Sequence, residues 1–279
     1  MLLNNSALVL EGGGMRGAFT AGVLDFLIKH NIRFPYTIGV SAGASNGVSF
    51  ASGQYRRGYD SNVTIQNIRP FIGIKHLLRG KGLIDLDFIF YEYPEKYNHF
   101  DFATYTASPD RFVIVITNCN TGEAEYHEEK QNHKRLLDLL RASCSLPVVC
   151  PIARLDDKPY VDGGVSDAIP FQKALDEGYK QLVVVLTRNA NYRKKEKTIY
   201  LPRFIYKKYP AIRARLADRG LRYNRQMDEL EKLEEKGVAI IIRPSHPLQV
   251  NRTEKDTKKL SDLYYGGYYQ AEKQLKGLL

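Results

Sequence analysis

The stretch Ile38–Gly47, IGVSAGASNG, places a serine between two glycines and then continues in small residues. Residues Tyr36–Val40 before it have the pattern of a short strand, and the small residues after Ser41 can form a helix that packs close to its neighbours. The spacing Gly39-x-Ser41-x-Gly43 fits a tight turn from strand to helix, where larger flanking side chains would crowd the serine. Such a turn can present a nucleophilic hydroxyl, but the same letters also occur in ordinary Gly/Ser loops. The rest of the chain decides between these two interpretations.

The surrounding sequence alternates between strand patterns and helix patterns. Apolar runs typical of strands lie at residues 7–11, 36–40, 111–118 and 181–187. This alternation predicts an α/β fold in which a mainly parallel central sheet is covered on both faces. We expect a catalytic domain over residues 6–190, followed by a mostly helical extension over residues 191–279 with one strand near 238–243. Gly266 and Gly267 predict an interruption of the last helix.

The composition is that of a soluble globular protein. Of the 279 residues, 43% are hydrophobic and 26% are charged, which is enough apolar material for a substantial core. No apolar run approaches the roughly 20 residues that cross a bilayer, and the first residues lack a signal-peptide pattern. We therefore expect a cytoplasmic protein. The three cysteines, Cys119, Cys144 and Cys150, have no metal-ligand spacing and are expected to be reduced, so we predict no metal and no cofactor.

A glycine turn follows the first strand. Residues Gly12–Gly17, GGGMRG, match G-x-G-x-x-G, a pattern that also opens dinucleotide-binding units. A dinucleotide site would need Asp or Glu at the end of the second strand, where this chain has Val40 and then Ser41. The missing acid argues against that use. The other use of such a turn is to direct backbone N–H groups at developing negative charge, to which Arg16 would add a positive charge.

A serine nucleophile also needs a base to accept its proton. Among the six histidines, His246 has the late position that a serine, acid, histidine order would require, and it remains an alternative. Asp162 ends a short strand and is followed by Gly163 and Gly164, so its carboxylate can face a cleft. A lone D-G-G is usually only a turn, and it gains weight from the other motifs.

Four motifs in order carry a family resemblance: E-G-G-G-x-R-G, G-x-S-x-G, R-A-S-C-S-L-P and D-G-G. Over residues 6–190 the chain resembles the patatin-like phospholipase family. The resemblance implies a lipid acyl hydrolase on a three-layer α/β fold, with a Ser-Asp dyad and no catalytic histidine. It makes Ser41 the nucleophile and Asp162 the proton acceptor. It assigns the oxyanion hole to the backbone of Gly12, Gly13, Gly14, Met15 and Arg16, and leaves Gly17, Gly39, Gly43, Gly163 and Gly164 as motif glycines.

The positive charge is concentrated in one segment. Residues Arg188–Arg225 hold 13 Lys and Arg against two acidic residues, whereas the rest of the chain holds 28 basic and 29 acidic residues. Tyrosines interleave with this charge, which fits contact with an anionic membrane at its inner face. A solvated helical face is the plain alternative, and nucleic acid is less favoured. We expect a phospholipid or another acyl lipid as substrate. The second hypothesis is a catalytically silent protein that binds membrane or nucleic acid on the same scaffold.

Overall fold

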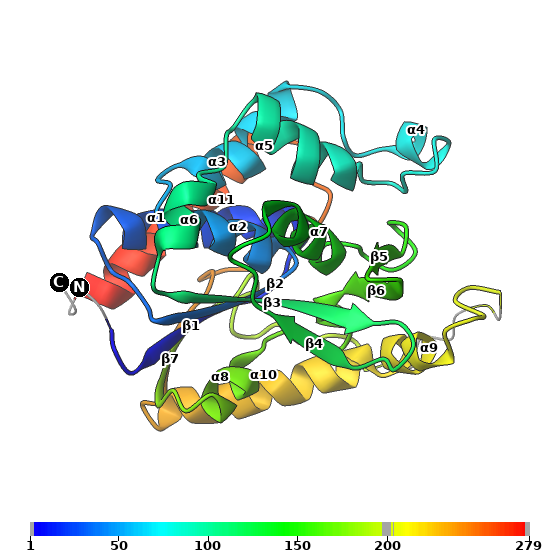
Figure 1. Cartoon of the computed structure of the whole chain (residues 1–279). Helices are drawn as coiled ribbons and strands as arrows, with labels where there is room; N and C mark the ends of the chain where they lie inside the picture. The colour runs from blue at the N-terminus through cyan, green and yellow to red at the C-terminus, as the bar shows by residue number, and fades with distance from the viewer. Residues whose placement is uncertain (1–2, 197–201, 203, 277–279) are drawn as a thin grey trace.

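The centre of the molecule is one mixed β-sheet between two layers of helices (Figure 1). The structure is a computed structural model that describes residues 3–196, 202 and 204–276. Within these residues the strands lie in the order β5-β6-β3-β2-β1-β7-β8, and β4 pairs with β3. The strands are Ser6–Leu10 (β1), Tyr36–Val40 (β2), Arg111–Asn118 (β3), Ala124–His127 (β4), Ala153–Leu155 (β5), Lys158–Asp162 (β6), Gln181–Val185 (β7) and Ala239–Ile242 (β8).

The sheet is parallel in its centre and antiparallel at one edge. Strands β3, β2, β1, β7 and β8 pair in parallel, whereas β4 and β6 pair with β3 in antiparallel register and β5 pairs with β6 in the same way. The predicted α/β sandwich is confirmed. Strand β4 was not predicted, because its sequence AEYH is short and partly exposed and lacks the apolar run that marks the buried strands.

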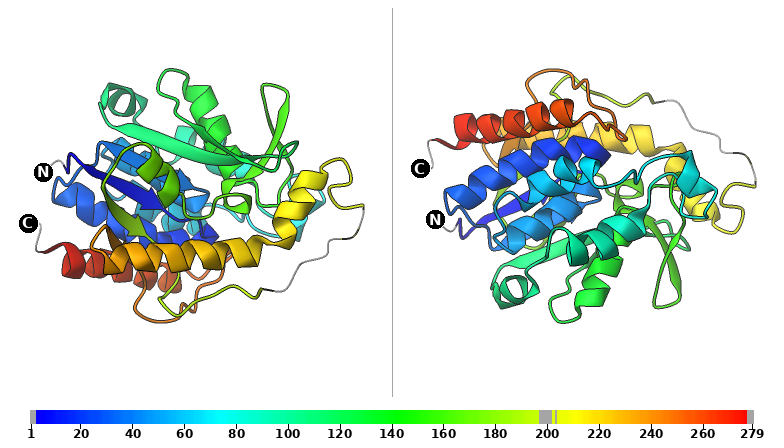
Figure 2. Two further views of the ribbon diagram at one scale, coloured as in Figure 1. Left: turned by 90° about the horizontal axis from the view of Figure 1, so that it is seen from below. Right: turned by 90° about the horizontal axis from the view of Figure 1, so that it is seen from above.

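Alternate residues of the central strands face two separate cores. Leu8 and Leu10 of β1 pack with helices α1, α2, α7 and α11 on one face. Ala7 and Val9 pack with α8 and α10 on the other face (Figures 1 and 2). The helices are Gly17–Lys29 (α1), Ala42–Ala51 (α2), Arg57–Asn62 (α3), Ile74–Leu77 (α4), Tyr93–Lys96 (α5), Phe102–Ala107 (α6), His133–Ser143 (α7), Phe171–Asp176 (α8), Pro210–Ala217 (α9), Arg219–Glu235 (α10) and Thr257–Leu275 (α11). Short 3₁₀ turns cover Gly14–Arg16, Thr64–Asn67 and Gly163–Val165, and a π-helical turn covers Phe88–Glu92.

Helix α11 runs beside α1 and is not interrupted, so the predicted break at Gly266 and Gly267 is wrong (Figure 2). A Cβ atom on Gly267 would lie 2.0 Å from the carbonyl oxygen of Phe19, and one on Gly22 would lie 1.9 Å from that of Tyr264. A Cβ on Gly266 would meet nothing within 4 Å. The glycine at 267 therefore permits a close helix crossing, and tertiary packing explains it better than a helix end does.

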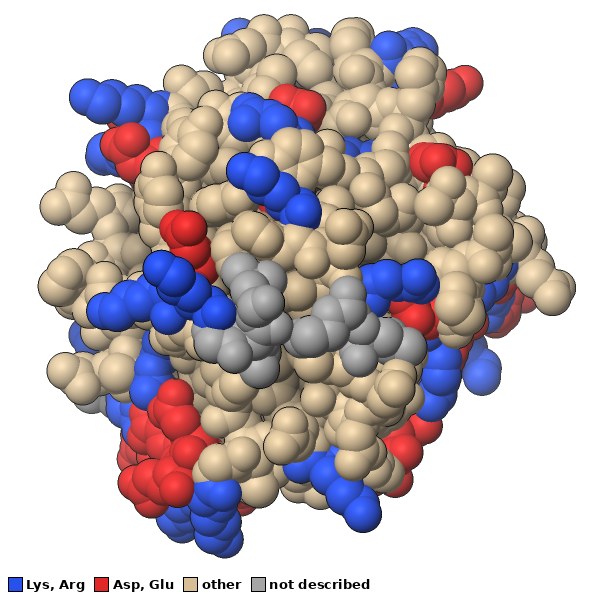
Figure 3. Space-filling model, turned by 90° about the vertical axis from the view of Figure 1, so that its left-hand side faces the viewer, with Lys and Arg blue, Asp and Glu red and all other residues tan. Residues whose placement is uncertain are grey.

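The C-terminal region is built into the same sandwich. Strand β8 extends the sheet beyond β7, and α10 and α11 cover opposite faces (Figure 1). On the face that carries the two chain ends, Lys and Arg are interspersed with Asp and Glu without forming a continuous basic area (Figure 3).

Candidate active site

Ser41 lies on a strained turn between β2 and α2. Its backbone has φ 54° and ψ −122°, a conformation that costs a non-glycine residue free energy and persists only where the surroundings impose it. A Cβ on Gly39 would lie 2.8 Å from the backbone of Ala44, and one on Gly43 would lie 2.4 Å from the carbonyl oxygen of Leu10. The two glycines therefore let the turn close tightly around the serine, as the motif predicts.

The backbone of Ser41 is held by a residue whose role the sequence did not reveal. The Ser41 N–H donates to Oγ of Ser143 at 2.8 Å, and that hydroxyl donates to the carbonyl oxygen of Val115 at 2.7 Å. Ser143 ends α7 and Val115 belongs to β3. The motif R-A-S-C-S-L-P thus connects the serine turn to the central sheet through its first serine.

Asp162 ends β6 and is 1% exposed. Its Oδ1 accepts a hydrogen bond from the Gly164 N–H at 2.8 Å. Its Oδ2 is buried and has no hydrogen-bond partner within the described residues. A Cβ on Gly163 would lie 2.2 Å from the carbonyl oxygen of Val115, so a glycine is needed there for the chain to pass β3. The carboxylate of Asp162 and Ser41 line the same cleft.

The glycine turn forms another wall of this cleft. A Cβ on Gly12 would lie 3.0 Å from Cβ of Ser41. In the part of the chain that the structure describes, no hydrogen bond uses the N–H groups of Gly12, Gly13 or Gly14. The Met15 N–H, which we predicted as an oxyanion donor, instead donates to the carbonyl oxygen of Arg252 at 3.1 Å. We therefore do not count the Met15 N–H among the candidate oxyanion donors.

The remaining motif glycine serves packing. The carbonyl oxygen of Gly17 accepts a hydrogen bond from Nδ2 of Asn46 at 3.0 Å, and a Cβ on Gly17 would lie 2.9 Å from that nitrogen and from Cβ of Ala42. Gly17 thus lets α1 start close to α2. The side chain of Arg16, beside it, is buried and lines the cleft.

The cleft has a polar half and an apolar half that meet at Ser41. The polar half carries five basic side chains and two carboxylates: Arg16, Arg188, Lys194, Arg219, Arg252, Glu11 and Asp162. The apolar half shares Gly14, Ser41, Leu146 and Arg252 with it. Its walls are mainly aliphatic and aromatic and include Met15, Ile65, Phe71, Ile84, Leu86, Ile89 and Phe90.

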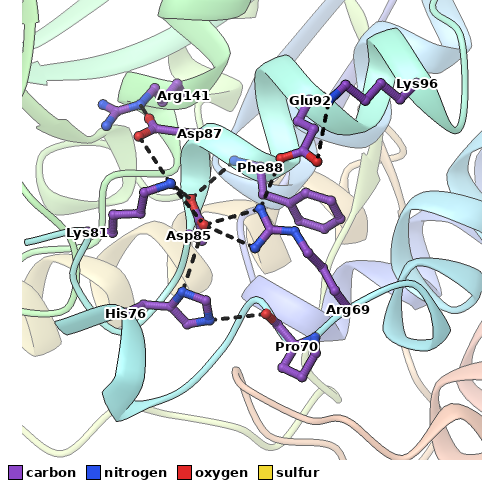
Figure 4. A network of polar contacts seen from close by, with 10 residues as sticks. All are labelled: Arg69, Pro70, His76, Lys81, Asp85, Asp87, Phe88, Glu92, Lys96 and Arg141. Atoms are coloured by element: carbon purple, nitrogen blue, oxygen red, sulfur yellow. Dashed lines mark hydrogen bonds and ion pairs between the residues drawn. The ribbon is translucent and has the colours of Figure 1, made fainter. Parts of the chain in front are cut away.

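A polar network around the buried Asp85 holds the outer wall of the apolar half (Figure 4). Asp85 is 2% exposed and accepts hydrogen bonds from Lys81 at 3.1 Å, from Arg69 at 3.3 Å and from the Phe88 N–H at 3.2 Å. These hydrogen bonds and charges outweigh burial and lower the pKa of Asp85. The His76 ring lies 3.8 Å from the same carboxylate. The network fixes both ends of the projecting segment that carries α4.

Other candidate nucleophiles and bases do not compete with Ser41 and Asp162. Burial raises the pKa of the Cys144 thiol well above its usual value, so this neighbour of Ser41 stays protonated. Burial also raises the pKa of Cys119 to about 12 and that of Cys150 to about 11. His246 is exposed and borders a different cleft, beside Phe19. Among the described residues no cluster of His, Cys, Asp and Glu could hold a metal ion.

The fold and the serine turn place the molecule among α/β proteins with a nucleophile-elbow type of geometry. The chain belongs to the patatin-like phospholipase family, whose sequence profile matches residues 8–175. A second profile, a domain of unknown function (DUF6363), matches residues 209–279. No helix among the described residues has both the length and the apolar character that a membrane crossing requires.

Similar proteins include a bacterial and a fungal relative. The chain is 35% identical over 199 residues to the uncharacterized protein YjjU of Escherichia coli (strain K12). The alignment covers 65% of this chain and 51% of YjjU. The chain is 28% identical over 193 residues to lysophospholipase NTE1 of Meyerozyma guilliermondii. That alignment covers 66% of this chain and 13% of NTE1. The chain thus matches about half of YjjU and a small part of NTE1. The solved structure of VipD from Legionella pneumophila aligns with a TM-score of 0.46 and 15% identity, over 98% of this chain and 67% of VipD.

Proposed function

We propose that the protein is a serine lipid acyl hydrolase, a phospholipase A-like esterase in which Ser41 is the nucleophile and Asp162 the proton acceptor. One observation carries the proposal: Oδ2 of Asp162 is buried without a partner in the cleft that also holds the strained Ser41. A buried polar atom without a hydrogen bond costs about 1–3 kcal/mol. A hydroxyl donor at the cleft would offset that cost, and the serine is the hydroxyl that the chemistry needs.

The reaction divides into two balanced steps. Ser41 Oγ attacks the carbonyl carbon of the ester while Asp162 takes the hydroxyl proton, and the C–O bond to the leaving alkoxide then breaks as Asp162 returns the proton to it. Water attacks the acyl-enzyme in the second step and gives its proton to Asp162. The bond between the acyl carbon and Ser41 Oγ breaks, Asp162 returns its proton to Ser41 Oγ, and the fatty acid leaves.

The backbone N–H groups of Gly12, Gly13 and Gly14 are the proposed oxyanion donors. They have no other partner among the described residues, and Gly12 adjoins Ser41. The N-terminus of α1 follows the turn, so its dipole also favours negative charge there. Donors that are already in place stabilise the tetrahedral oxyanion without reorganisation, which often is the largest single contribution to such reactions.

The two halves of the cleft suit an acyl lipid. A fatty acyl chain can lie in the apolar half while its ester reaches Ser41, because both halves share this residue. Relatives named lysophospholipase support such a substrate. We include contact with a membrane surface in the proposal.

We place the proposed membrane contact on a small apolar rim rather than on the whole basic segment. Within Arg188–Arg225, Arg193 pairs with Asp228 and Glu231, and Arg222 pairs with Asp218. The proposed contact is instead the apolar rim, which we define as the exposed side chains Ile74, Leu77, Leu78, Val148 and Phe204.

Hydrogen bonds connect the segments that carry the rim. The Leu83 N–H donates to the carbonyl oxygen of Val149 at 2.7 Å, and the Val148 N–H donates to the Tyr206 hydroxyl at 3.0 Å. The rim thus joins α4, the loop at Val148 and the segment at Phe204. The exposed cations Lys75, Arg79, Lys207 and Lys208 lie beside it in the sequence. Exposed apolar side chains next to Lys and Arg suit the surface of an anionic bilayer.

The test of the catalytic proposal compares four variants on p-nitrophenyl octanoate. Ser41→Ala and Asp162→Asn should each lower kcat at least a hundredfold, because each removes a group that takes part in both steps. Ser52→Ala and Asp167→Asn are matched controls, since these buried residues lie outside the cleft lining. Circular dichroism checks the fold of all four. Full activity of either cleft variant would overturn the proposed roles.

A further inference from the structure

The polar half of the cleft holds an excess of positive charge that the reaction itself does not use. Its cations come from four places in the chain: the 3₁₀ turn before α1 (Arg16), the loop after β7 (Arg188 and Lys194), the start of α10 (Arg219) and the loop before α11 (Arg252). We name these five side chains the basic pocket. Four of the five lie beyond residues 8–175, the part matched by the patatin-like profile.

Glu11 and Asp162 attract basic side chains of the pocket at longer range but form no ion pair with them. None of the five basic side chains forms an ion pair in the described ranges of the chain. Arg16 is only 4% exposed, and its Nε is buried without a hydrogen-bond partner. Nε of Arg188 is also buried and unpartnered. Arg219 donates from Nε only to the carbonyl oxygen of Gly164, at 2.9 Å.

The nearby carboxylate Glu11 already accepts three hydrogen bonds. Its Oε2 accepts from the Thr187 N–H at 2.6 Å and from the Thr187 hydroxyl at 3.0 Å, and its Oε1 accepts from the Tyr223 hydroxyl at 2.9 Å. Glu11 therefore offers charge to the pocket but no direct bond. The other carboxylate, Asp162, is the proposed base.

Burial and the crowding of like charges are unfavourable for the basic side chains of the pocket. Burial, followed by the charges of Arg188 and Arg252, lowers the pKa of Arg16 to about 10. Burial and the neighbouring arginines, Arg219 first, lower the pKa of Lys194 to about 6. Buried charges without partners are costly to a folded protein. A bound anion would offset this cost and would accept the unused N–H groups.

We propose that the basic pocket binds the phosphate of the lipid substrate and selects a phosphomonoester head group, such as that of a lysophosphatidate, over zwitterionic and uncharged head groups. The inference rests on the proposed function, because the phosphate is placed by an ester at Ser41. Guanidinium groups match phosphate oxygens in geometry and charge. The two negative charges of a phosphomonoester match the four arginines of the pocket better than a phosphodiester with an attached ammonium does.

The pocket offers no free aromatic ring to bind the ammonium of a choline or ethanolamine group. The two tyrosine rings of the pocket lining, which could receive an ammonium, are already covered by basic side chains. Arg188 lies 4.3 Å from the centre of the Tyr192 ring, and Lys194 lies 3.6 Å from that of the Tyr223 ring. Four arginines against two carboxylates line the pocket, so a cationic head group would meet a net positive charge there.

The kinetic test compares substrates with one acyl chain and different head groups: oleoyl lysophosphatidate, oleoyl lysophosphatidylcholine and monooleoylglycerol. We expect kcat/KM to be at least tenfold higher for lysophosphatidate than for the other two. Arg188→Gln and Arg252→Gln should each reduce this preference at least fivefold. Arg193→Gln is the matched control, because Arg193 comes from the same loop but pairs with Asp228 and Glu231 outside the pocket. An equal or reversed preference in the parent protein would overturn the inference.

A binding test separates this inference from the catalytic proposal. Inorganic phosphate is titrated calorimetrically into the Ser41→Ala protein, which needs no turnover. We expect phosphate to bind, choline chloride not to bind, and Arg188→Gln in the same background to weaken phosphate binding at least fivefold. Absence of phosphate binding overturns the inference even if Ser41 proves catalytic. Binding without any lysophosphatidate preference also overturns it, since the ligand would then be a free anion. Esterase activity that survives Ser41→Ala overturns the catalytic proposal alone.

Discussion

At the scale of single residues, the hydroxyl of Ser143 decides how firmly the serine turn is held. It accepts from the Ser41 N–H and donates to Val115, so both bonding capacities serve the strained turn. Ser143→Ala should lower kcat on p-nitrophenyl octanoate about tenfold with little change in KM, because the buried N–H of Ser41 loses its acceptor and the turn can relax. Steady-state kinetics checks this.

Ser145→Ala is the matched control for Ser143→Ala. The Ser145 hydroxyl bonds only to the carbonyl oxygen of Arg141, at 2.9 Å, and its backbone carbonyl still accepts from the Asp162 N–H in the variant. We expect a much smaller effect on kcat. Similar losses in both variants would show that the region is sensitive in general and would contradict a specific role for Ser143.

The raised pKa of Asp25 predicts that the stability of the fold depends on pH. Burial between α1 and α11 raises its pKa to about 6, although the Tyr264 hydroxyl donates to it at 2.6 Å and the Arg56 N–H at 3.0 Å. The raised pKa means that the folded state holds this proton more tightly than the unfolded state does. The resulting stability is present below about pH 4 and is lost as the pH rises through about 6.

Asp25→Asn removes that titration. The free energy of unfolding of the variant minus that of the parent should increase from pH 4.5 to pH 7.5. For a pKa shift of this size the increase is on the order of 3 kcal/mol at most. Urea unfolding at the two pH values measures the difference. A gap between variant and parent that stays constant with pH would contradict the shifted pKa.

At the scale of elements, the crossing of α1 and α11 depends on two glycines. Gly267→Ala would bring a methyl group within 2.0 Å of the Phe19 carbonyl oxygen, so the helices must separate. We expect a loss of about 1–3 kcal/mol, typical of overpacking. Gly266→Ala has free space and should be neutral or stabilising by up to about 1 kcal/mol through helix propensity. Equal melting temperatures of the two variants would rule out this account of the crossing.

Secondary structure was predictable wherever the sequence pattern and burial agreed. The strands at 36–40 and 111–118 have the predicted bounds, because apolar runs report burial directly. Gly266 and Gly267 were misjudged because local propensity marks a helix end while contact with α1 allows the helix to continue. The basic pocket was not predicted, since its cations converge from four separate segments and no spacing in the sequence encodes that convergence. Linked motifs predicted Ser41 and Asp162 as site residues, whereas the contacts of Ser143 and Gly163 with Val115 could be seen only in the structure.

At the scale of the whole molecule, the apolar rim predicts how the protein meets lipid. Leu78 is 84% exposed and Phe204 is 78% exposed, which leaves large apolar surfaces in water unless a membrane covers them. Leu78→Ser with Phe204→Ser should weaken co-sedimentation with vesicles containing anionic lipid at least fivefold. Hydrolysis of monomeric p-nitrophenyl octanoate should change less than twofold, because the rim lies outside the cleft lining.

The pair Tyr265→Ser and Tyr269→Ser is the control for the rim. These exposed residues lie on α11, away from α4. Vesicle binding should be retained in this control. Equal losses of binding in both double variants would contradict a localised membrane contact.

The central claim is that Ser41 is an activated nucleophile, and labelling with a fluorophosphonate probe tests it most directly. The account predicts stoichiometric modification that maps to the peptide containing Ser41, is slowed at least a hundredfold by Asp162→Asn, and keeps its rate in Asp167→Asn. An unlabelled, folded parent protein, or a label on another residue, would contradict the account and favour a catalytically silent binding protein on this scaffold.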